Sequence, residues 1–174
     1  ETLKQAGIKF DVVFTSLLRR AIETNQLTLE ALGQSDLKVR QDWRLNERHY
    51  GALQGLDKKA TTLKYGVEQT NLWRRSFDVA PPPVDLSSPE HPRNDPRYRN
   101  ISQNDLPNTE CLKDVVARVV PFFDQHIVGE LRNNKNVLIT AHGNSLRALV
   151  MHIENLSPEQ IAKFNIPTGV PRKY

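Results

Sequence analysis

The stretch "LITAHGNSLRAL", from Leu138 to Leu149, decides the fold class. Its first residues are mostly apolar or β-branched, which predicts a buried strand. The strand stops at His142 and Gly143, where a helical pattern begins at once. A strand that passes straight into a helix is typical of sheets in which strands and helices alternate along the chain.

The same order of strand and helix recurs elsewhere in the chain. Residues 10–16 ("FDVVFTS") and 37–43 ("LKVRQDW") predict two more strands, and residues 17–32 predict a helix that Gly33 ends. Two short helical patterns lie within residues 58–77. Such alternation implies a mainly parallel sheet with helices on both faces. We therefore predict an α/β fold of three layers, αβα, around a mainly parallel central sheet.

Residues 78–108 differ in kind from the rest of the chain. They hold seven of the eleven prolines and show no apolar periodicity. A long segment of this kind in a compact domain is typically either a functional lid or disordered. We interpret it as a proline-rich insert or lid within a single domain over residues 1–174. A long amphipathic helix follows it, with Thr109 as the expected N-cap, because a hydroxyl there can accept from unpaired backbone N–H groups.

The chain has 174 residues, 24 basic and 20 acidic side chains, a net charge of +4 and one cysteine. This length suits one domain with a substantial core. Acidic residues are interspersed with the basic ones, so we expect no nucleic-acid partner. Every apolar run is too short to cross a bilayer, so we expect no membrane partner. Cys111 cannot form an internal disulfide, which indicates a reducing, cytoplasmic setting.

The junction at His142 is the first candidate site. In parallel α/β sheets, ligands gather at the carboxyl ends of the strands. The amides of Gly143 and Asn144 would open the following helix, where N–H groups and the helix dipole attract anions. The alternative is a turn glycine beside a solvated histidine, with Asn144 or Ser145 only capping the helix.

Pairs of arginines mark two further candidate segments. Arg19 and Arg20 lie in the first turn of the predicted helix, where cations oppose the helix dipole. A guanidinium that faces a bound phosphate explains this placement better than stability does. We expect Arg20 to point inward and Arg19 to be solvated. Arg74 and Arg75, in "LWRRSF", form either a solvated helix face or part of the same ligand site.

The loop "NERHYG", residues 46–51, brings an acid, a base, an imidazole and a phenol together. Glu47 is either part of an ordinary salt bridge or, if the loop borders a cleft, a proton donor and acceptor. The sequence has no metal-ligand spacing and no glycine-rich nucleotide loop, so we expect no metal. Cationic side chains would then neutralise a small ligand with several negative groups. Five of them lie next to loops: Arg20, Arg48, Lys58, Arg74 and Arg75.

Several segments together resemble one family. The chain is similar to the cofactor-dependent phosphoglycerate mutases of the histidine phosphatase superfamily, in the family's order and over nearly its whole length. The segment "GALQGLDK" resembles the glycolytic mutases more than the bisphosphoglycerate mutases. The matching segments are "TSLLRRAIET", "LNERHYGALQGLDK", "LWRRSF", "AHGNSLRAL" and "NIPTGVP".

The resemblance implies interconversion of 3-phosphoglycerate and 2-phosphoglycerate in glycolysis and gluconeogenesis, through a phosphohistidine and primed by 2,3-bisphosphoglycerate, without a metal. It implies that Glu47 donates and accepts the proton and that His142 stabilises the phosphoryl group during transfer. It also implies a homo-oligomer, a dimer or tetramer. The substrate-binding residues that it implies are Arg20, Gly143 and Asn144 for the phosphoryl group, and Arg48, His49, Tyr50, Lys58, Arg74 and Arg75 for the carboxylate and the other phosphate.

One part of the family pattern is absent. The family's nucleophile is a histidine in an Arg-His-Gly motif on its first strand, and residues 1–174 contain no such motif. The chain also opens in what reads as the end of a helix and closes at "GVPRKY", where we expect a strand to start. We therefore expect an internal part of a longer protein, incomplete at both ends, without its first strand and inactive alone. A phosphatase or bisphosphoglycerate synthase of the same fold, and a non-catalytic phospholigand-binding protein, stay open as alternatives.

Overall fold

Three parallel strands form the centre of the computed structural model, which describes residues 1–57 and 59–174. The sheet has the order β2–β1–β3, with β1 (Val12–Thr15) between β2 (Val39–Gln41) and β3 (Val137–Thr140). Both pairings of β1 are parallel. The three predicted strands are therefore confirmed, and their carboxyl ends lie at one edge of the sheet.

Helices connect the strands and follow the last of them. The glycine predicted to end the helix after β1 does so: Gly33 has a left-handed conformation, with φ of 68°. Ser157 caps the last helix, because its hydroxyl accepts from the backbone N–H of Gln160. None of the helices formed by the described residues could span a membrane. In chain order the helices are α1 (Thr2–Gln5), α2 (Arg19–Leu32), α3 (Lys58–Tyr65), α4 (Val67–Arg75), α5 (Leu112–Phe122), α6 (Val128–Arg132), α7 (Gly143–Glu154) and α8 (Pro158–Lys163).

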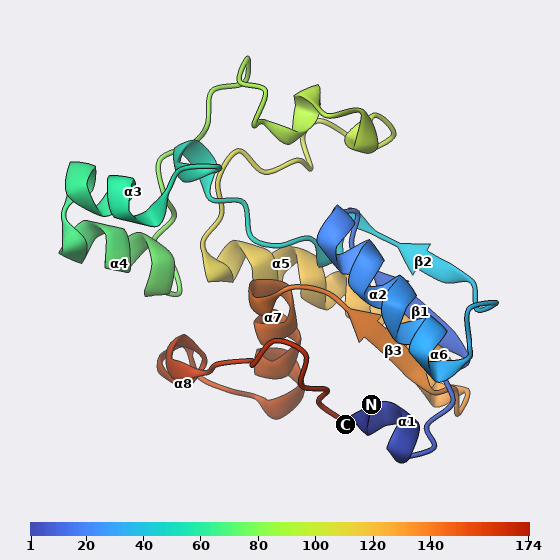
Figure 1. Ribbon diagram of the computed structural model, residues 1–174. Coiled ribbons are helices and arrows are strands. Elements are labelled where there is room, and N and C mark those ends of the chain that lie inside the picture. Colours follow the sequence, from blue (N-terminus) through green and yellow to red (C-terminus); the bar gives the residue numbers. More distant parts are fainter.

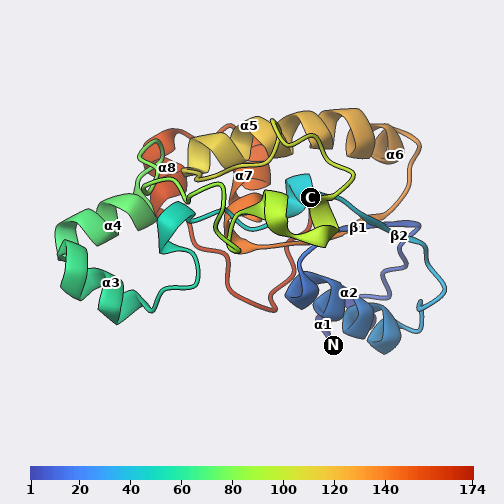
Figure 2. The same cartoon turned by 90° about the horizontal axis from the view of Figure 1, so that it is seen from above.

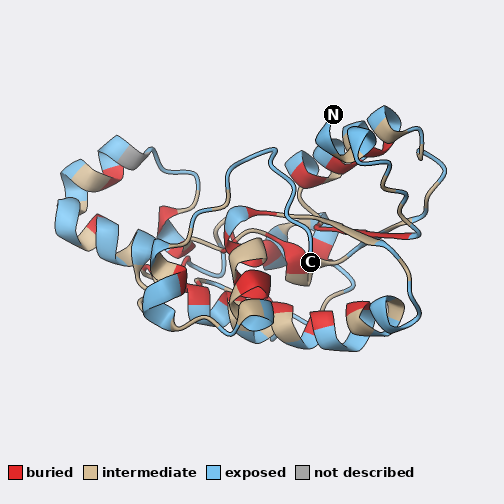
Figure 3. Ribbon diagram, turned by 90° about the horizontal axis from the view of Figure 1, so that it is seen from below, coloured by how far each residue is buried: buried red, intermediate tan, exposed pale blue. Residues whose placement is uncertain are grey.

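Helices cover both faces of the sheet. Figure 2 shows α5 and α7 together on one face and α2 on the other. The buried residues of these helices lie on the sides that face the sheet (Figure 3). Such an arrangement leaves polar side chains outside and apolar ones in two internal layers. The predicted three-layer αβα architecture with a parallel sheet is confirmed.

Strand β1 supplies apolar side chains to both layers. Val12 and Phe14 belong to the main hydrophobic core, where the rings of Phe14 and Phe122 meet edge-on at 6.0 Å between centroids. Val13 points to the opposite face, because side chains alternate along a strand, and it is fully buried. A central strand that is apolar on both faces thus fixes the position of its carboxyl end.

The helix predicted to start at Thr109 begins later. The Thr109 hydroxyl donates instead to the carbonyl oxygen of Pro81 at 2.7 Å, so the prediction of an N-cap there is wrong. Cys111 is the N-cap, and its backbone N–H donates to the carboxylate of Asp114 at 2.9 Å. Packing against the preceding segment thus takes the hydroxyl that local capping would have used. A π-helical turn at Phe123–Ile127 then separates α5 from α6.

The proline-rich segment 78–108 packs against the domain. It forms two short 3-10 turns, Pro92–Asn94 and Pro96–Tyr98, and buries Val84 and Leu106. The segment thus makes defined contacts with the domain, and its role as an insert or lid stays a prediction. Figure 1 shows it as an extended arc beyond the strand ends, while α3 and α4 form a helical pair to one side of the sheet.

Candidate active site

Side chains at the carboxyl ends of β1 and β3 connect the two strands by hydrogen bonds. Thr15 lies opposite Thr140 in the register, and its hydroxyl donates to the Thr140 carbonyl oxygen at 2.7 Å. Directly after β1, the hydroxyl oxygen of Ser16 lies 2.8 Å from Nε2 of His142. The register of the sheet therefore holds His142 at its carboxyl edge, where ligands gather in this class of fold.

His142 is a neutral imidazole with a defined tautomer. Only 6% of the residue is exposed. Arg20 Nε donates to Nδ1 at 3.2 Å, and a guanidinium cannot accept, so the ring proton is on Nε2 and is donated to Ser16. Burial, followed by the positive charge of Arg20, lowers the pKa of His142 from 6.5 to about 4. At neutral pH this ring is an uncharged hydrogen-bond donor.

Glu47 reaches the N-terminus of α7 from the loop at residues 46–51. Its Oε1 accepts from the backbone N–H of Arg48 at 2.8 Å and from that of Asn144 at 3.3 Å. Asn144 is the second residue of α7, where unpaired N–H groups and the helix dipole favour a negative group. The structure thus places an anion at the predicted position, but the anion is a carboxylate of the protein itself.

Two of the predicted arginines, Arg48 and Arg74, lie against the ring of Tyr50. The Cζ atoms of Arg48 and Arg74 lie 4.5 and 5.7 Å from the centroid of its ring. The Tyr50 hydroxyl accepts from the Asn144 side-chain amide at 3.3 Å. Arg48 is 2% exposed, and its Nε is buried without a hydrogen-bond partner among the described residues. A buried guanidinium with an unused donor is suited to an anion that enters from outside.

The remaining predicted residues are placed differently. His49 turns away from this cluster: its Nδ1 accepts from the backbone of Gly51 at 3.1 Å, and its Nε2 lies 3.1 Å from the carbonyl oxygen of Glu90. Arg75, at the end of α4, and Gly143, at the start of α7, are exposed but lie beside the cluster. The charge of Arg75 lowers the pKa of Arg147, and a Cβ atom at Gly143 would lie 3.9 Å from Oε2 of Glu47. The prediction for Lys58 concerns a side chain outside the described residues.

Arg147 is a member of the cluster that the sequence reasoning missed. It donates to the Asn144 side-chain oxygen at 3.1 Å and to the carbonyl oxygen of Ile161, while its Nε is buried without a partner among the described residues. Burial, and then the charges of Arg48 and Arg75, lower the pKa of Arg147. Its position three residues after Asn144, on the same helix face, was the signal in the sequence.

The sequence reasoning also missed Arg118 and Glu110, which lie behind the loop at residues 46–51. Arg118 of α5 and Glu110 form an ion pair at 2.6 Å, and their side chains are only 9% and 3% exposed. Both lie in the segment that reads as an amphipathic helix and its start, where one arginine and one glutamate carry no distinctive signal. Their contacts with the loop appear only when the chain has folded.

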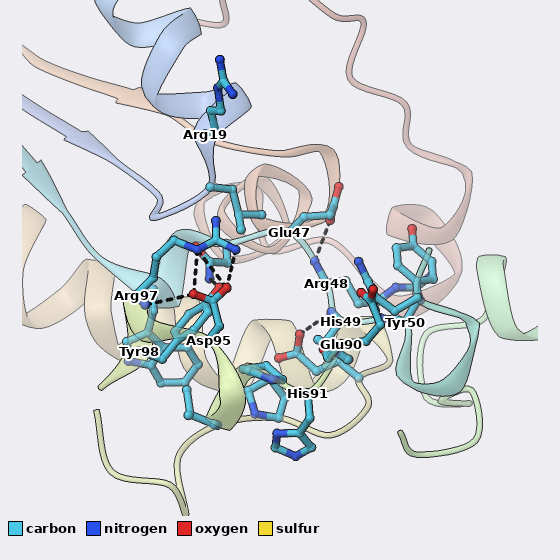
Figure 4. Close-up of a pocket in the computed structure, with 18 of the residues that line it drawn as sticks. Arg19, Glu47, Arg48, His49, Tyr50, Glu90, His91, Asp95, Arg97 and Tyr98 are labelled. Carbon is cyan, nitrogen blue, oxygen red and sulfur yellow. Dashed lines mark hydrogen bonds and ion pairs between the residues drawn. The ribbon is translucent and has the colours of Figure 1, made fainter. Parts of the chain in front are cut away.

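A cavity of about 600 Å³ opens beside the cluster. The start of α2, the loop around Glu47 and the proline-rich segment line it. Figure 4 shows Glu47, Arg48 and Tyr50 on one side of this cavity and the Asp95–Arg97 ion pair on the other. Among the described residues, no group of three acidic, histidine or cysteine side chains is arranged to hold a metal ion. The lining carries both guanidinium and carboxylate groups, and several of them are already paired with each other, as Arg97 is with Asp95.

The chain matches one family of known proteins. The family model of the histidine phosphatase superfamily (branch 1) matches residues 2–94 and 85–170. A 2,3-bisphosphoglycerate-dependent phosphoglycerate mutase of Borreliella burgdorferi is 54% identical over 172 residues, which are 99% of this chain and 69% of the relative. The chain belongs to the phosphoglycerate mutases of the histidine phosphatase superfamily. A mutase of the same description from Xylella fastidiosa is also 54% identical, over 97% of this chain and 68% of the relative.

Solved structures of phosphoglycerate mutase-like proteins share the fold. A structure described as mycobacterial hydrolase 1 has a TM-score of 0.65 at 22% identity, over 92% of this chain and 64% of that one. A phosphoglycerate mutase of Bacillus anthracis has a TM-score of 0.58 at 23% identity, over 88% of this chain and 62% of that one. The chain therefore spans less than two thirds of the length of these two structures.

Proposed function

We propose that the protein interconverts 3-phosphoglycerate and 2-phosphoglycerate through a phosphohistidine and a 2,3-bisphosphoglycerate intermediate. The contact between the Glu47 carboxylate and the Asn144 amide, beside His142, supports this proposal most directly. It brings a proton acceptor, an anion-binding helix end and a neutral imidazole from distant segments to one place. The 54% identity to mutases that depend on 2,3-bisphosphoglycerate supports the substrate.

The phosphoryl group would be held by His142, Arg20 and the amide of Asn144. His142 donates through Nε2, so a phosphoryl oxygen would take the place of the Ser16 hydroxyl as its acceptor. Arg20, whose Nε is bonded to the other ring nitrogen, would add a charge-assisted hydrogen bond through its remaining guanidinium donors. Because positioning and charge stabilisation do most of phosphoryl transfer, these donors supply much of the catalysis. The nucleophile would be the family's Arg-His-Gly histidine, which is not among residues 1–174.

Glu47 would move the proton. When the substrate hydroxyl attacks phosphorus, the bond between phosphorus and the histidine nitrogen breaks, and the hydroxyl proton passes to the Glu47 carboxylate. In the second half-reaction the other phosphate returns to the histidine, and Glu47 gives the proton back to the oxygen that is released. Arg48, Arg74 and Arg147 would bind the negative groups that do not react.

The proline-rich segment would keep water away from the phosphohistidine. Its Tyr98 hydroxyl accepts from the side-chain amide of Asn46 at 2.8 Å, so it contacts the residue directly before Glu47. Asn46 in turn accepts from the backbone N–H of Leu17 at 3.0 Å. A wall fixed in this way, rather than a free lid, would favour transfer to the substrate over hydrolysis.

The family and the cysteine content support proposals about the cellular location and the oligomeric state. As a glycolytic and gluconeogenic enzyme, the protein would work in the cytoplasm, which agrees with its single cysteine. As the family resemblance implies, it would form a homo-oligomer. Size-exclusion chromatography with light scattering measures that state directly.

The full-length gene product, assayed in two ways, tests the proposal. We expect an enolase-coupled assay with 3-phosphoglycerate and a trace of 2,3-bisphosphoglycerate to show mutase turnover well above phosphate release. Phosphate release that exceeds turnover would favour a phosphatase. Binding without either reaction would favour a phospholigand-binding protein.

Replacement of the proposed proton carrier tests the residue assignment. Glu47→Gln removes the charge but keeps the shape, so we expect kcat to fall about 10²- to 10⁴-fold, the usual contribution of general acid–base catalysis. Binding of 2,3-bisphosphoglycerate, measured by calorimetry, should persist. Mutase turnover equal to that of the wild type would remove Glu47 from the mechanism.

A further inference from the structure

The ion pair between Arg118 and Glu110 is almost fully buried directly behind the loop that carries Glu47. Removing two charges from water is costly, and their mutual attraction offsets this only when their other hydrogen-bonding groups also have partners. The other hydrogen bonds of Arg118 and Glu110 therefore show which part of the molecule the ion pair holds in place. These hydrogen bonds go to the loop at residues 46–51 and to Arg44, two residues before it.

Arg118 bonds three backbone carbonyls around Glu47. Its guanidinium donates to the carbonyl oxygen of Arg44 at 2.6 Å, of Asn46 at 3.1 Å and of Glu47 at 3.3 Å. Two further bonds, at 2.6 and 3.0 Å, go to the carboxylate of Glu110. A planar guanidinium has five N–H donors in a fixed fork, so one side chain can hold several acceptors in place. A lysine ammonium could not reach all of them at once.

Glu110 holds both backbone groups of His49, two residues after Glu47. Its carboxylate accepts from the backbone N–H of His49 at 2.8 Å, and its own N–H donates to the His49 carbonyl oxygen at 2.9 Å. Together the two residues bind backbone groups on both sides of Glu47. Loops are usually the mobile parts of a domain. This loop is instead tied to α5.

We infer that Arg118, supported by Glu110, is a positioning residue that fixes Glu47 against the N-terminus of α7 for proton transfer. This inference rests on the proposed role of Glu47. Among the described residues, the Glu47 side chain accepts only from the backbone N–H groups of Arg48 and Asn144, so its placement depends on where the backbone of the loop lies. Arg118 also lies near enough to His142 to lower the pKa of that ring, which agrees with its place directly behind the site.

The test is a double-mutant cycle in the full-length gene product, with R118K, E47Q and the double variant. R118K keeps the charge but loses the fork, so we expect kcat to fall about 10²-fold, as a small misplacement of a catalytic group can cause. KM should change little. Since Arg118 acts through Glu47, R118K should cause no further loss in the E47Q background. An unchanged kcat in R118K, or the same loss in both backgrounds, would overturn the inference.

A matched control separates position from general damage. Arg40 and Glu130 form an ion pair of the same length, 2.6 Å, away from the loop, and R40K should leave kcat unchanged. Thermal unfolding shows whether R118K is folded. If R118K is not folded, E110Q is measured instead. A loss of kcat in E110Q that disappears in the E47Q background supports positioning. A wild-type kcat in E110Q overturns the inference. Equal turnover of wild type and E47Q would instead count against the proposed function.

Discussion

His142 is uncharged because burial and the positive charge of Arg20 disfavour a second proton on its ring. It lies behind two strand ends, with the Arg20 guanidinium on one ring nitrogen and the Ser16 hydroxyl on the other. Protonation would place two cations in contact within a buried site. A neutral ring can still donate one hydrogen bond to a phosphoryl oxygen, so charge is left to the arginines. Burial and charge thus assign different tasks to neighbouring side chains.

The buried ring makes folding stability depend on pH. The pKa of His142 is about 4 in the folded state and 6.5 as a reference for the unfolded chain, so the unfolded chain binds more protons between these values. The contribution is fully present above pH 6.5 and is lost as the pH falls towards 4. It amounts to at most about 3 kcal/mol. Urea unfolding of wild type and His142→Gln at pH 7.5, 5.5 and 4.5 measures it.

We expect His142→Gln to lose stability less steeply than the wild type over this range. Identical slopes for wild type and His142→Gln would contradict the assignment of a buried neutral ring.

At the scale of elements, the loop at residues 46–51 and the proline-rich segment form one unit. Gly51 has φ of 57°, and a Cβ atom there would lie 2.1 Å from the carbonyl oxygen of Pro82 and 2.7 Å from the hydroxyl of Thr109. The next residue, Ala52, donates its N–H to the same Pro82 carbonyl at 2.8 Å. The two backbones approach so closely that only glycine fits.

Gly51→Ala should therefore separate the loop from the segment. We expect a loss in the free energy of unfolding of about 3 kcal/mol or more, from the left-handed conformation together with overpacking. Gly33→Ala is the matched control: Gly33 is left-handed, with φ of 68°, but a Cβ there meets nothing within 4 Å, so about 1–2 kcal/mol is expected. Urea unfolding compares the two. Equal losses would show that the contact with Pro82 has no energetic weight.

At the scale of the whole molecule, one ligand would connect segments that are distant in the chain. The cluster draws on α2, the loop, α4 and α7, and two of its buried guanidinium nitrogens have no partner among the described residues. Mutual repulsion of these cations opposes folding, and the proposed anionic ligand would relieve it. A ligand that binds only the folded state stabilises it by about 2.7 kcal/mol at a hundred times its dissociation constant.

Variants of two neighbouring arginines at the start of α2, Arg20 and Arg19, test this stabilisation by a ligand. We expect 2,3-bisphosphoglycerate to raise the unfolding temperature, and more at low than at high salt. Arg20→Met should weaken the ligand about tenfold, since hydrogen bonds between charged groups are lost. Arg19→Met is the control, because Arg19 points outward and pairs with Glu23 at 2.6 Å. Equal thermal shifts in the two variants would contradict the predicted role of Arg20.

Many local features of this protein could be predicted from the sequence. The strand at residues 10–16, the helix that ends at Gly33 and the junction at His142 follow from patterns within a few neighbouring residues. Periodicity and end signals act at that range, because backbone hydrogen bonds in helices and turns join nearby residues. The capping prediction at Thr109 fails for the same reason: its hydroxyl is used by Pro81, 28 residues away.

Only the tertiary structure decided how the site is assembled. Glu47 meets Asn144 across 97 residues, and Arg118 meets the loop across more than 70. Such contacts depend on the sheet register and on how α5 and α7 pack, which no short stretch of sequence specifies. A charged side chain has the same local signal whether it is solvated or buried against a partner. What differs is the cost of burial, and that is set by the groups that folding brings around it.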